Sequence, residues 1–176
     1  MKNRSALTLT ITAVMIAVTA VFTIMARVPI PATQGYFNLS DVAIYFSAFA
    51  FGPLLGGVIG GVGAAIADLL AGFPQWALLT LLAHGLEGLV AGWLGRDKGV
   101  PGLIVAWAAG ALVMMAVYFL GEGLILTGWG PALVELPVNL LQNVVGGLIG
   151  IPLFLAVRKA YPPLTRIGRE VTWREE

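Results

Sequence analysis

The sequence predicts an all-α membrane protein, a bundle of six transmembrane helices with both the N- and the C-terminus in the cytoplasm. Three observations lead to this prediction: the composition, the spacing of the apolar runs and the distribution of basic residues. Of the 176 residues, 59% are hydrophobic and 11% are charged, and the mean hydropathy is +0.91. Soluble domains carry about 25% charged residues. A soluble fold could not cover this chain with polar surface, so we expect a multi-pass protein of the cell membrane.

Six apolar segments divide the chain, and we treat residues 1–176 as one integral membrane domain. The segments are approximately 6–26, 41–52, 53–71, 75–95, 102–125 and 132–157. The first is about 21 residues long, enough to span a ~30 Å hydrocarbon core. The apolar core of a signal peptide is shorter, roughly 7–15 residues, so we expect a retained helix. The second segment is short and meets the third at Gly52-Pro53, a pair typical of a turn.

The basic residues determine the predicted orientation, because cytoplasmic loops carry an excess of Lys and Arg. With the N-terminus inside, only Arg27 of the ten basic residues faces outward. The nine on the cytoplasmic side are Lys2, Arg4, Arg96, Lys98, Arg158, Lys159, Arg166, Arg169 and Arg174. The polar, aromatic loop 29–40 is therefore predicted to lie outside, and it closes on Ser40 and Asp41, where the next helix could be capped.

The sequence lacks the residues and motifs that several classes of function require. With no cysteine there are no disulfides, thiolate metal sites or cysteine nucleophiles. His84 is the single histidine, which excludes a multi-histidine metal cage. There is no P-loop, HExxH or GxSxG motif, and the net charge of +1 does not indicate nucleic acid. We expect no catalytic residue, no metal and no cofactor, and any ATP hydrolysis has to come from another chain.

Polar residues gather on one face of each of two late segments. On 75–95 the spacings of four, four and three place Trp76, Thr80, His84 and Glu87 together. On 132–157 the polar residues are Glu135, Asn139, Gln142 and Asn143. An ionisable group at mid-membrane costs at least ~2.5–3.5 kcal/mol, so it usually faces a cavity or a partner. Two interpretations follow, a shared cavity or hydrogen bonds between helices, and two faces that run inward from the same side favour the cavity.

Small residues mark the early segments. Glycine and alanine recur through 53–71, and Ala13 and Ala17 are four apart on 6–26. Small residues at this spacing let helices approach closely in lipid. For the glycines we expect packing within the bundle. For Ala13 and Ala17, internal packing and a groove for a partner's helix are both open.

In combination these features resemble the S components of energy-coupling factor (ECF) transporters, in the riboflavin/hydroxymethylpyrimidine-type branch. The resemblance covers residues 6–157, and no single motif carries it. It rests on the Ala-xxx-Ala stripe and on 34-QGYFNLSD-41, 52-GPLLGGVIGGVGAAIADLL-70, 74-PQWALL-79 and 84-HGLEGLVAG-92.

The resemblance implies a membrane-embedded subunit of a prokaryotic plasma membrane that binds a water-soluble vitamin or precursor. Its implied partners are a transmembrane coupling (T) subunit, two cytoplasmic ATPases and membrane lipid. Ala13 and Ala17 would contact the coupling subunit. The first loop would act as a lid. The implied ligand-binding residues are Gln34, Tyr36, Asn38, Trp76, His84, Glu87, Asn139 and Asn143.

Several alternatives stay open. Instead of a binding subunit, the chain could be a stand-alone proton-linked carrier or a membrane enzyme that uses His84 and Glu87, or a purely structural membrane protein. The ligand is expected to be neutral or cationic, since the polar faces hold acids and amides and few basic residues. A pyrimidine or pyridine precursor and riboflavin both fit.

Overall fold

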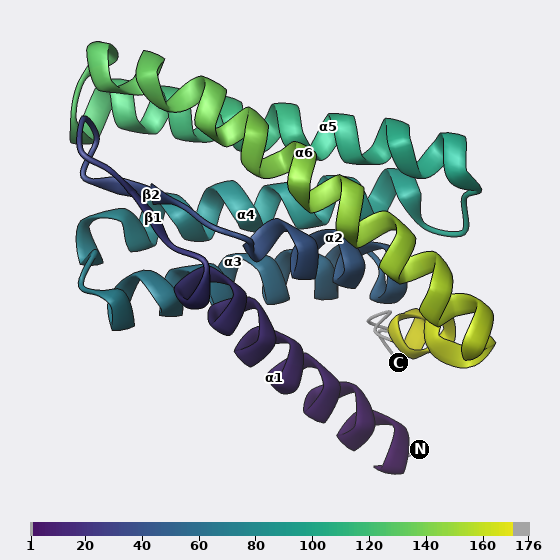
Figure 1. Cartoon of the computed structure of the whole chain (residues 1–176). Coiled ribbons are helices and arrows are strands. Elements are labelled where there is room, and N and C mark those ends of the chain that lie inside the picture. The colour runs from purple at the N-terminus through teal and green to yellow at the C-terminus, as the bar shows by residue number, and fades with distance from the viewer. Residues whose placement is uncertain (1, 171–176) are drawn as a thin grey trace.

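The fold is a bundle of helices with one small hairpin (Figure 1). The structure, a computed structural model, describes residues 2–170; Arg174, one of the counted basic residues, lies outside this range. The α-helices are α1 (Lys2–Met25), α2 (Ser40–Phe51), α3 (Pro53–Ala71), α4 (Pro74–Gly95), α5 (Val100–Gly121) and α6 (Trp129–Ala160). A π-helical turn, η1 (Glu122–Leu126), follows α5, and a 3-10 helix, η2 (Pro162–Glu170), follows α6.

The all-α membrane fold is confirmed, and the described residues contain five helices long and apolar enough to cross a membrane. These are α1, α3, α4, α5 together with η1, and α6. The short helix α2 has 12 residues, which at 1.5 Å per residue do not span a ~30 Å core. Eleven of them are buried, because α2 lies in the centre of the bundle and contacts α1, α3, α4 and α6. The count of six spanning helices stays a prediction.

The segment between α1 and α2 forms a two-stranded hairpin, where the sequence indicated only a loop. Strand β1 (Val28–Ile30) pairs antiparallel with β2 (Gly35–Phe37). Gln34 takes a left-handed backbone conformation (φ 56°) at the turn. The backbone N–H of Gly35 then donates to Thr33 Oγ1 at 3.1 Å. The hairpin lies at one end of the bundle (Figure 1), where β2 contacts α6 and Tyr36 reaches Asp68 of α3.

Glycines bring α3 and α4 close together. A Cβ atom at Gly88 would lie 2.7 Å from the carbonyl carbon of Gly56, and one at Gly61 would lie 2.6 Å from the carbonyl oxygen of Leu81. Real side-chain carbons do not approach backbone so closely, so the contact requires glycine. The small residues of 53–71 therefore pack within the bundle.

The ends of the elements separate into two groups (Figure 1). The start of α1, the α4–α5 turn and the end of α6 lie at one end of the bundle, and Arg158 Nη1 donates to the carbonyl oxygen of Lys98 at 3.3 Å there. The hairpin, the α3–α4 turn and η1 lie at the other end, where Arg27 follows α1. Apart from Arg27, the described segments that carry basic residues thus lie at one end, as the orientation prediction requires, and which end faces the cytoplasm stays a prediction.

Candidate functional site

A cavity lies beneath the hairpin, at the end of the bundle opposite the termini. It encloses about 30 Å³ with the hairpin in place, well below the ~300–1,000 Å³ typical of occupied small-molecule sites, so a ligand would have to move the hairpin or the wall to enter. Its polar wall is formed by side chains of α3, α4 and α6: Asp68, Thr80, His84, Glu135, Asn139 and Gln142. All six side chains are buried.

Aromatic side chains form a second wall. The rings of Trp76, on α4, and Tyr118, on α5, lie 6.3 Å apart between centroids, and both line the cavity. The Tyr118 hydroxyl donates to Thr80 Oγ1 at 2.9 Å, and its ring meets the His84 ring edge-on at 5.6 Å. Buried aromatic rings held in this way can pack against a flat ligand ring.

Tyr36 holds the hairpin against the end of α3, over the cavity. Its hydroxyl donates to Asp68 Oδ1, and its ring packs 5.0 Å from Phe73, while the guanidinium of Arg27 lies over both rings. Burial, and then the neighbouring Asp68 carboxylate, raise the pKa of Tyr36 above its usual value. The phenol therefore stays protonated and remains a hydrogen-bond donor to α3.

Gln142 contacts the chain just after β2. The backbone N–H of Asn38 donates to Gln142 Oε1 at 3.0 Å. The Asn38 side chain meanwhile accepts from the backbone N–H of Ser40 at 2.8 Å. Gln142 Nε2 donates in turn to Asp41 Oδ1 at 3.1 Å. The Gln142 side chain, at the cavity wall, thus connects the backbone after β2 to the buried start of α2.

Two carboxylates of the wall each keep one oxygen without a partner. Asp68 Oδ2 and Glu135 Oε2 are buried and accept no hydrogen bond. Glu135 lies directly under the hairpin, since a Cβ at Gly35 would be 3.1 Å from its Oε1. No lysine or arginine of the described residues lines the cavity. The cavity is thus acidic and offers acceptors to a ligand that carries hydrogen-bond donors or positive charge.

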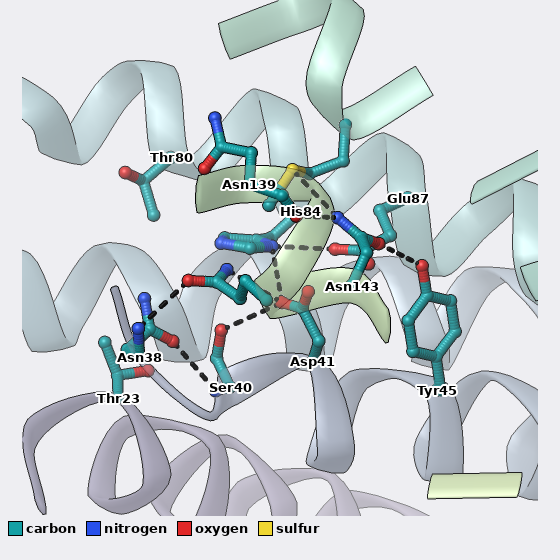
Figure 2. Close-up of polar contacts among 12 residues, drawn as sticks. Thr23, Asn38, Ser40, Asp41, Tyr45, Thr80, His84, Glu87, Asn139 and Asn143 are labelled. Atoms are coloured by element: carbon teal, nitrogen blue, oxygen red, sulfur yellow. Dashed lines mark hydrogen bonds and ion pairs between the residues drawn. The ribbon is translucent and has the colours of Figure 1, made fainter. Parts of the chain in front are cut away.

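A buried cluster of Asp41, His84 and Glu87 adjoins the cavity, which His84 lines (Figure 2). His84 Nδ1 is 2.7 Å from Glu87 Oε2 and 3.6 Å from Asp41 Oδ1. One ligand atom from each of the three residues lies within 4.8 Å of the others. At bond lengths of about 2.0–2.2 Å, tetrahedral zinc ligands would be more than ~3 Å apart, whereas 2.7 Å is a hydrogen-bond distance. We therefore describe the group as a hydrogen-bonded cluster.

Five of the eight residues that the resemblance implied as ligand contacts line the cavity. They are Tyr36, Asn38, Trp76, His84 and Asn139. Gln34 is exposed at the hairpin turn. Glu87 and Asn143 are fully buried below the lining residues, and for these three a ligand contact stays a prediction.

Asn143 is occupied by its neighbours in the bundle. Its side chain accepts from the Tyr45 hydroxyl at 2.5 Å and donates to the Asn139 carbonyl oxygen at 3.0 Å and to Met114 Sδ at 3.4 Å. Its own carbonyl oxygen accepts from Trp107 Nε1 at 2.8 Å. These contacts join α2, α5 and α6, which favours the interhelical interpretation for this residue.

Sequence reasoning missed several lining residues and Asp41. Asp68 and Glu135 are visible as charges within apolar segments, but their helix positions alone place them near the membrane surface. The expectation that Ser40 and Asp41 cap α2 is wrong, since neither side chain caps that helix. Asp41 instead turns inward to His84. Only the packing of α2 against α4 reveals that position.

Ala13 and Ala17 do not take part in the cavity. Both are exposed on α1, on a surface that no other described element covers, while Ala20 is buried. The stripe therefore faces away from the protein's own bundle.

Comparisons with known proteins agree with this arrangement. The family model for the S component of ECF-type riboflavin transporters matches residues 3–159. The chain is 38% identical over 169 residues to the thiamine precursor transporter HmpT of Lactococcus lactis subsp. cremoris (strain MG1363), which covers 96% of this chain and 93% of HmpT. It is 39% identical over 144 residues to an uncharacterised protein of Pyrococcus woesei, covering 82% of this chain and 97% of that protein.

A solved structure shares the fold. It is described as "Structure and mechanism of the S component of a bacterial ECF transporter" and superposes with a TM-score of 0.72, covering 91% of this chain and 98% of that chain. The sequences are 20% identical, so this likeness concerns the fold alone.

Proposed function

The chain belongs to the S-component family of ECF-type riboflavin transporters, and we propose that it binds a small single-ring vitamin precursor, neutral or cationic, for uptake across the cell membrane. Membership of this family makes it a multi-pass membrane protein and a transporter component. Family membership is shown, and the ligand class is what we propose in addition.

The observation that carries this proposal is the acidic cavity. Asp68 and Glu135 present buried oxygens without partners, and no basic side chain among the described residues lines the wall. A buried acceptor left without a hydrogen bond costs free energy, about 1–3 kcal/mol. A ligand with amino or hydroxyl donors would satisfy these oxygens, and an anionic ligand would be repelled.

The small size of the cavity favours a ligand with a single ring over a ligand with three fused rings. The cavity encloses only about 30 Å³, so a pyrimidine or pyridine between Trp76 and the polar wall would displace the hairpin less than a larger ring system would. The relative HmpT is described as a thiamine precursor transporter, and we extend that class of ligand to this chain. Riboflavin is the second candidate, since the matching family model describes riboflavin transporters; it would require the hairpin to move outward.

The implied partners are the coupling subunit and two ATPases of an ECF module, because an S component works within such an assembly. We propose that α1 docks on the coupling subunit through Ala13 and Ala17, which are exposed and small enough for close helix contact. In this role the protein binds its ligand without changing it chemically. Uptake that persists without ATPases would instead support the proton-linked carrier.

Binding titrations in detergent test the ligand class, after mass spectrometry of any compound that co-purifies. Asp68→Asn and Glu135→Gln keep the side-chain shape and remove the charge. We expect each to weaken binding by roughly ten- to a hundredfold, since hydrogen bonds to charged groups contribute about 1.5–3 kcal/mol. Glu122→Gln is the matched control, because Glu122 is buried but bonded to Thr127 outside the cavity. Tight binding of an anionic compound would contradict the proposal.

A further inference from the structure

His84 joins the buried carboxylates to the cavity. Its Nδ1 contacts Glu87 Oε2 at 2.7 Å and lies 3.6 Å from Asp41 Oδ1. Its Nε2 has no hydrogen-bond partner within the described part of the chain, and Figure 2 shows this nitrogen on the side of the ring away from Glu87, toward Thr80. Since His84 and Thr80 both line the cavity, Nε2 is the atom that the cluster presents to a ligand.

Among the described residues, His84 is the only basic side chain paired with Asp41 or Glu87. Asp41 and Glu87 are 0% exposed, and Asp41 Oδ2 and Glu87 Oε1 accept no hydrogen bond. Two unpaired carboxylates are too costly to bury as a double negative charge. The cluster must therefore hold protons of its own.

The hydrogen bonds indicate where these protons lie. Asp41 Oδ1 accepts from Gln142 Nε2 at 3.1 Å and from Ser40 Oγ at 3.2 Å, which suits an ionised carboxylate. Glu87 has one hydrogen-bond contact, with His84 through Oε2, so it has fewer donors than Asp41 and is the acid to which we assign the extra proton. An ionised Asp41, a protonated His84 and a neutral Glu87 sum to zero charge.

The other titratable groups around His84 do not supply a cation. They are Tyr45 on α2, Asp68 on α3, Tyr118 on α5, and Tyr36 and Glu135, which line the same cavity from β2 and α6. All are acids or phenols, so the imidazole is the one group of the cluster that can carry positive charge.

We propose that Asp41, His84 and Glu87 form a proton-donating site that recognises a weakly basic ring nitrogen of the ligand through His84 Nε2. This inference rests on the proposed function and narrows its ligand class to nitrogen rings of the pyridine or pyrimidine type. Asp41 and Glu87 are positioning residues, because they hold the charge and the orientation of His84 without lining the cavity.

The step is a single proton transfer. The Nε2–H bond of His84 breaks and an N–H bond forms on the ring nitrogen. The ligand becomes positively charged, the cluster becomes negatively charged, and the two remain in contact as an ion pair. A ring that carries CH at this position cannot accept the proton.

Paired ligands test the inference. The probes are a hydroxymethyl aminopyrimidine and its benzene isostere, in which CH replaces both ring nitrogens. We expect the wild-type protein to bind the pyrimidine about tenfold more tightly or better, as for a charge-assisted hydrogen bond. The ratio should fall toward one in Asp41→Asn, which removes the charge that keeps His84 protonated, and should stay near the wild-type value in Glu87→Gln, which keeps a neutral acceptor for Nδ1–H. Ser47→Ala is the control, since Ser47 is buried on the same helix as Asp41 but has no hydrogen-bond partner and does not line the cavity, so its ratio should match the wild type.

A second measurement uses the wild-type protein and so does not depend on the folding of a variant. His84 is the only histidine of the chain, so ¹⁵N-histidine labelling reports this ring alone. We expect an imidazolium signature in the free protein and a neutral imidazole, protonated at Nδ1, in the pyrimidine complex. A neutral ring that stays unchanged on binding, or equal affinity for the two probes, would overturn the inference and leave the proposed function intact. If neither probe binds, the proposed ligand class fails as well.

Discussion

The hydroxyl of Tyr36 donates a hydrogen bond to the carboxylate of Asp68 and so joins the hairpin to α3 across the mouth of the cavity. The two residues are 32 positions apart in the chain. Asp68 also lines the cavity. We therefore expect this contact to couple the position of the hairpin to the retention of a ligand.

Tyr36→Phe should accelerate ligand release. The substitution keeps the ring contact with Phe73 and removes the hydroxyl. A hydrogen bond to a charged group contributes about 1.5–3 kcal/mol, so we expect dissociation to be roughly ten- to a hundredfold faster in a ligand-chase experiment. Tyr161→Phe, at an exposed tyrosine after α6, is the control. Unchanged dissociation would show that the hairpin is held by other contacts.

Gln142→Ala should lower ligand affinity and Asn143→Ala should lower stability, although the two residues are adjacent. Gln142 lines the cavity and holds the backbone of Asn38, so its loss should weaken ligand binding several-fold to about thirtyfold. Asn143 accepts from Tyr45 in the bundle interior, and its loss leaves that hydroxyl only the longer contact with the Trp107 carbonyl oxygen at 3.4 Å, at about 0.5–1.5 kcal/mol of stability. Binding titrations and melting curves on both variants separate these effects. A loss of affinity in Asn143→Ala without a lower Tm would instead support a ligand contact for Asn143.

Ala13→Leu or Ala17→Leu should reduce uptake while ligand affinity in detergent stays near the wild-type value. A bulky side chain would hold a partner helix away from the exposed stripe on α1. The matched control is Ala116→Leu, the same change at an exposed position of α5. If affinity falls together with uptake, the stripe supports the fold of the protein and not a partner contact.

The orientation prediction can be tested by labelling with an impermeant maleimide on intact cells, because the chain has no cysteine of its own. Ala32 is exposed on the hairpin, and Gly99 is exposed with nothing within 4 Å of the position that a Cβ atom would take. Ala32→Cys should label from outside and Gly99→Cys only after the cells are opened. Thr33 is unsuitable because it is fully buried. Labelling of Gly99→Cys on intact cells would reverse the orientation and the direction in which the cavity opens.

Gly88→Ala should destabilise the bundle, whereas Gly85→Ala should be tolerated. A Cβ at Gly88 would lie 2.7 Å from the carbonyl carbon of Gly56, while one at Gly85 meets nothing nearer than 3.7 Å. Overpacking costs typically about 1–3 kcal/mol, so we expect a lower Tm for Gly88→Ala alone. Equal melting temperatures would mean that α3 and α4 can separate at little cost.

The sequence by itself determined the membrane class, the apolar helices and the polar face of α4. These properties are local: hydropathy over about 20 residues decides whether a helix suits a bilayer, and the 3.6-residue period decides which side chains share a face. That is why Trp76, Thr80 and His84, chosen by spacing, line one cavity.

The tertiary structure alone decided which of the polar groups meet. Glu87 shares the face of His84 yet lies below the cavity, because α2 brings Asp41 beneath that part of α4. Asp68 and Glu135, which helix position alone places near the surface, become wall residues because the hairpin folds over them. The periodicity of a helix gives the direction of a side chain, but the element that covers it comes from elsewhere in the chain.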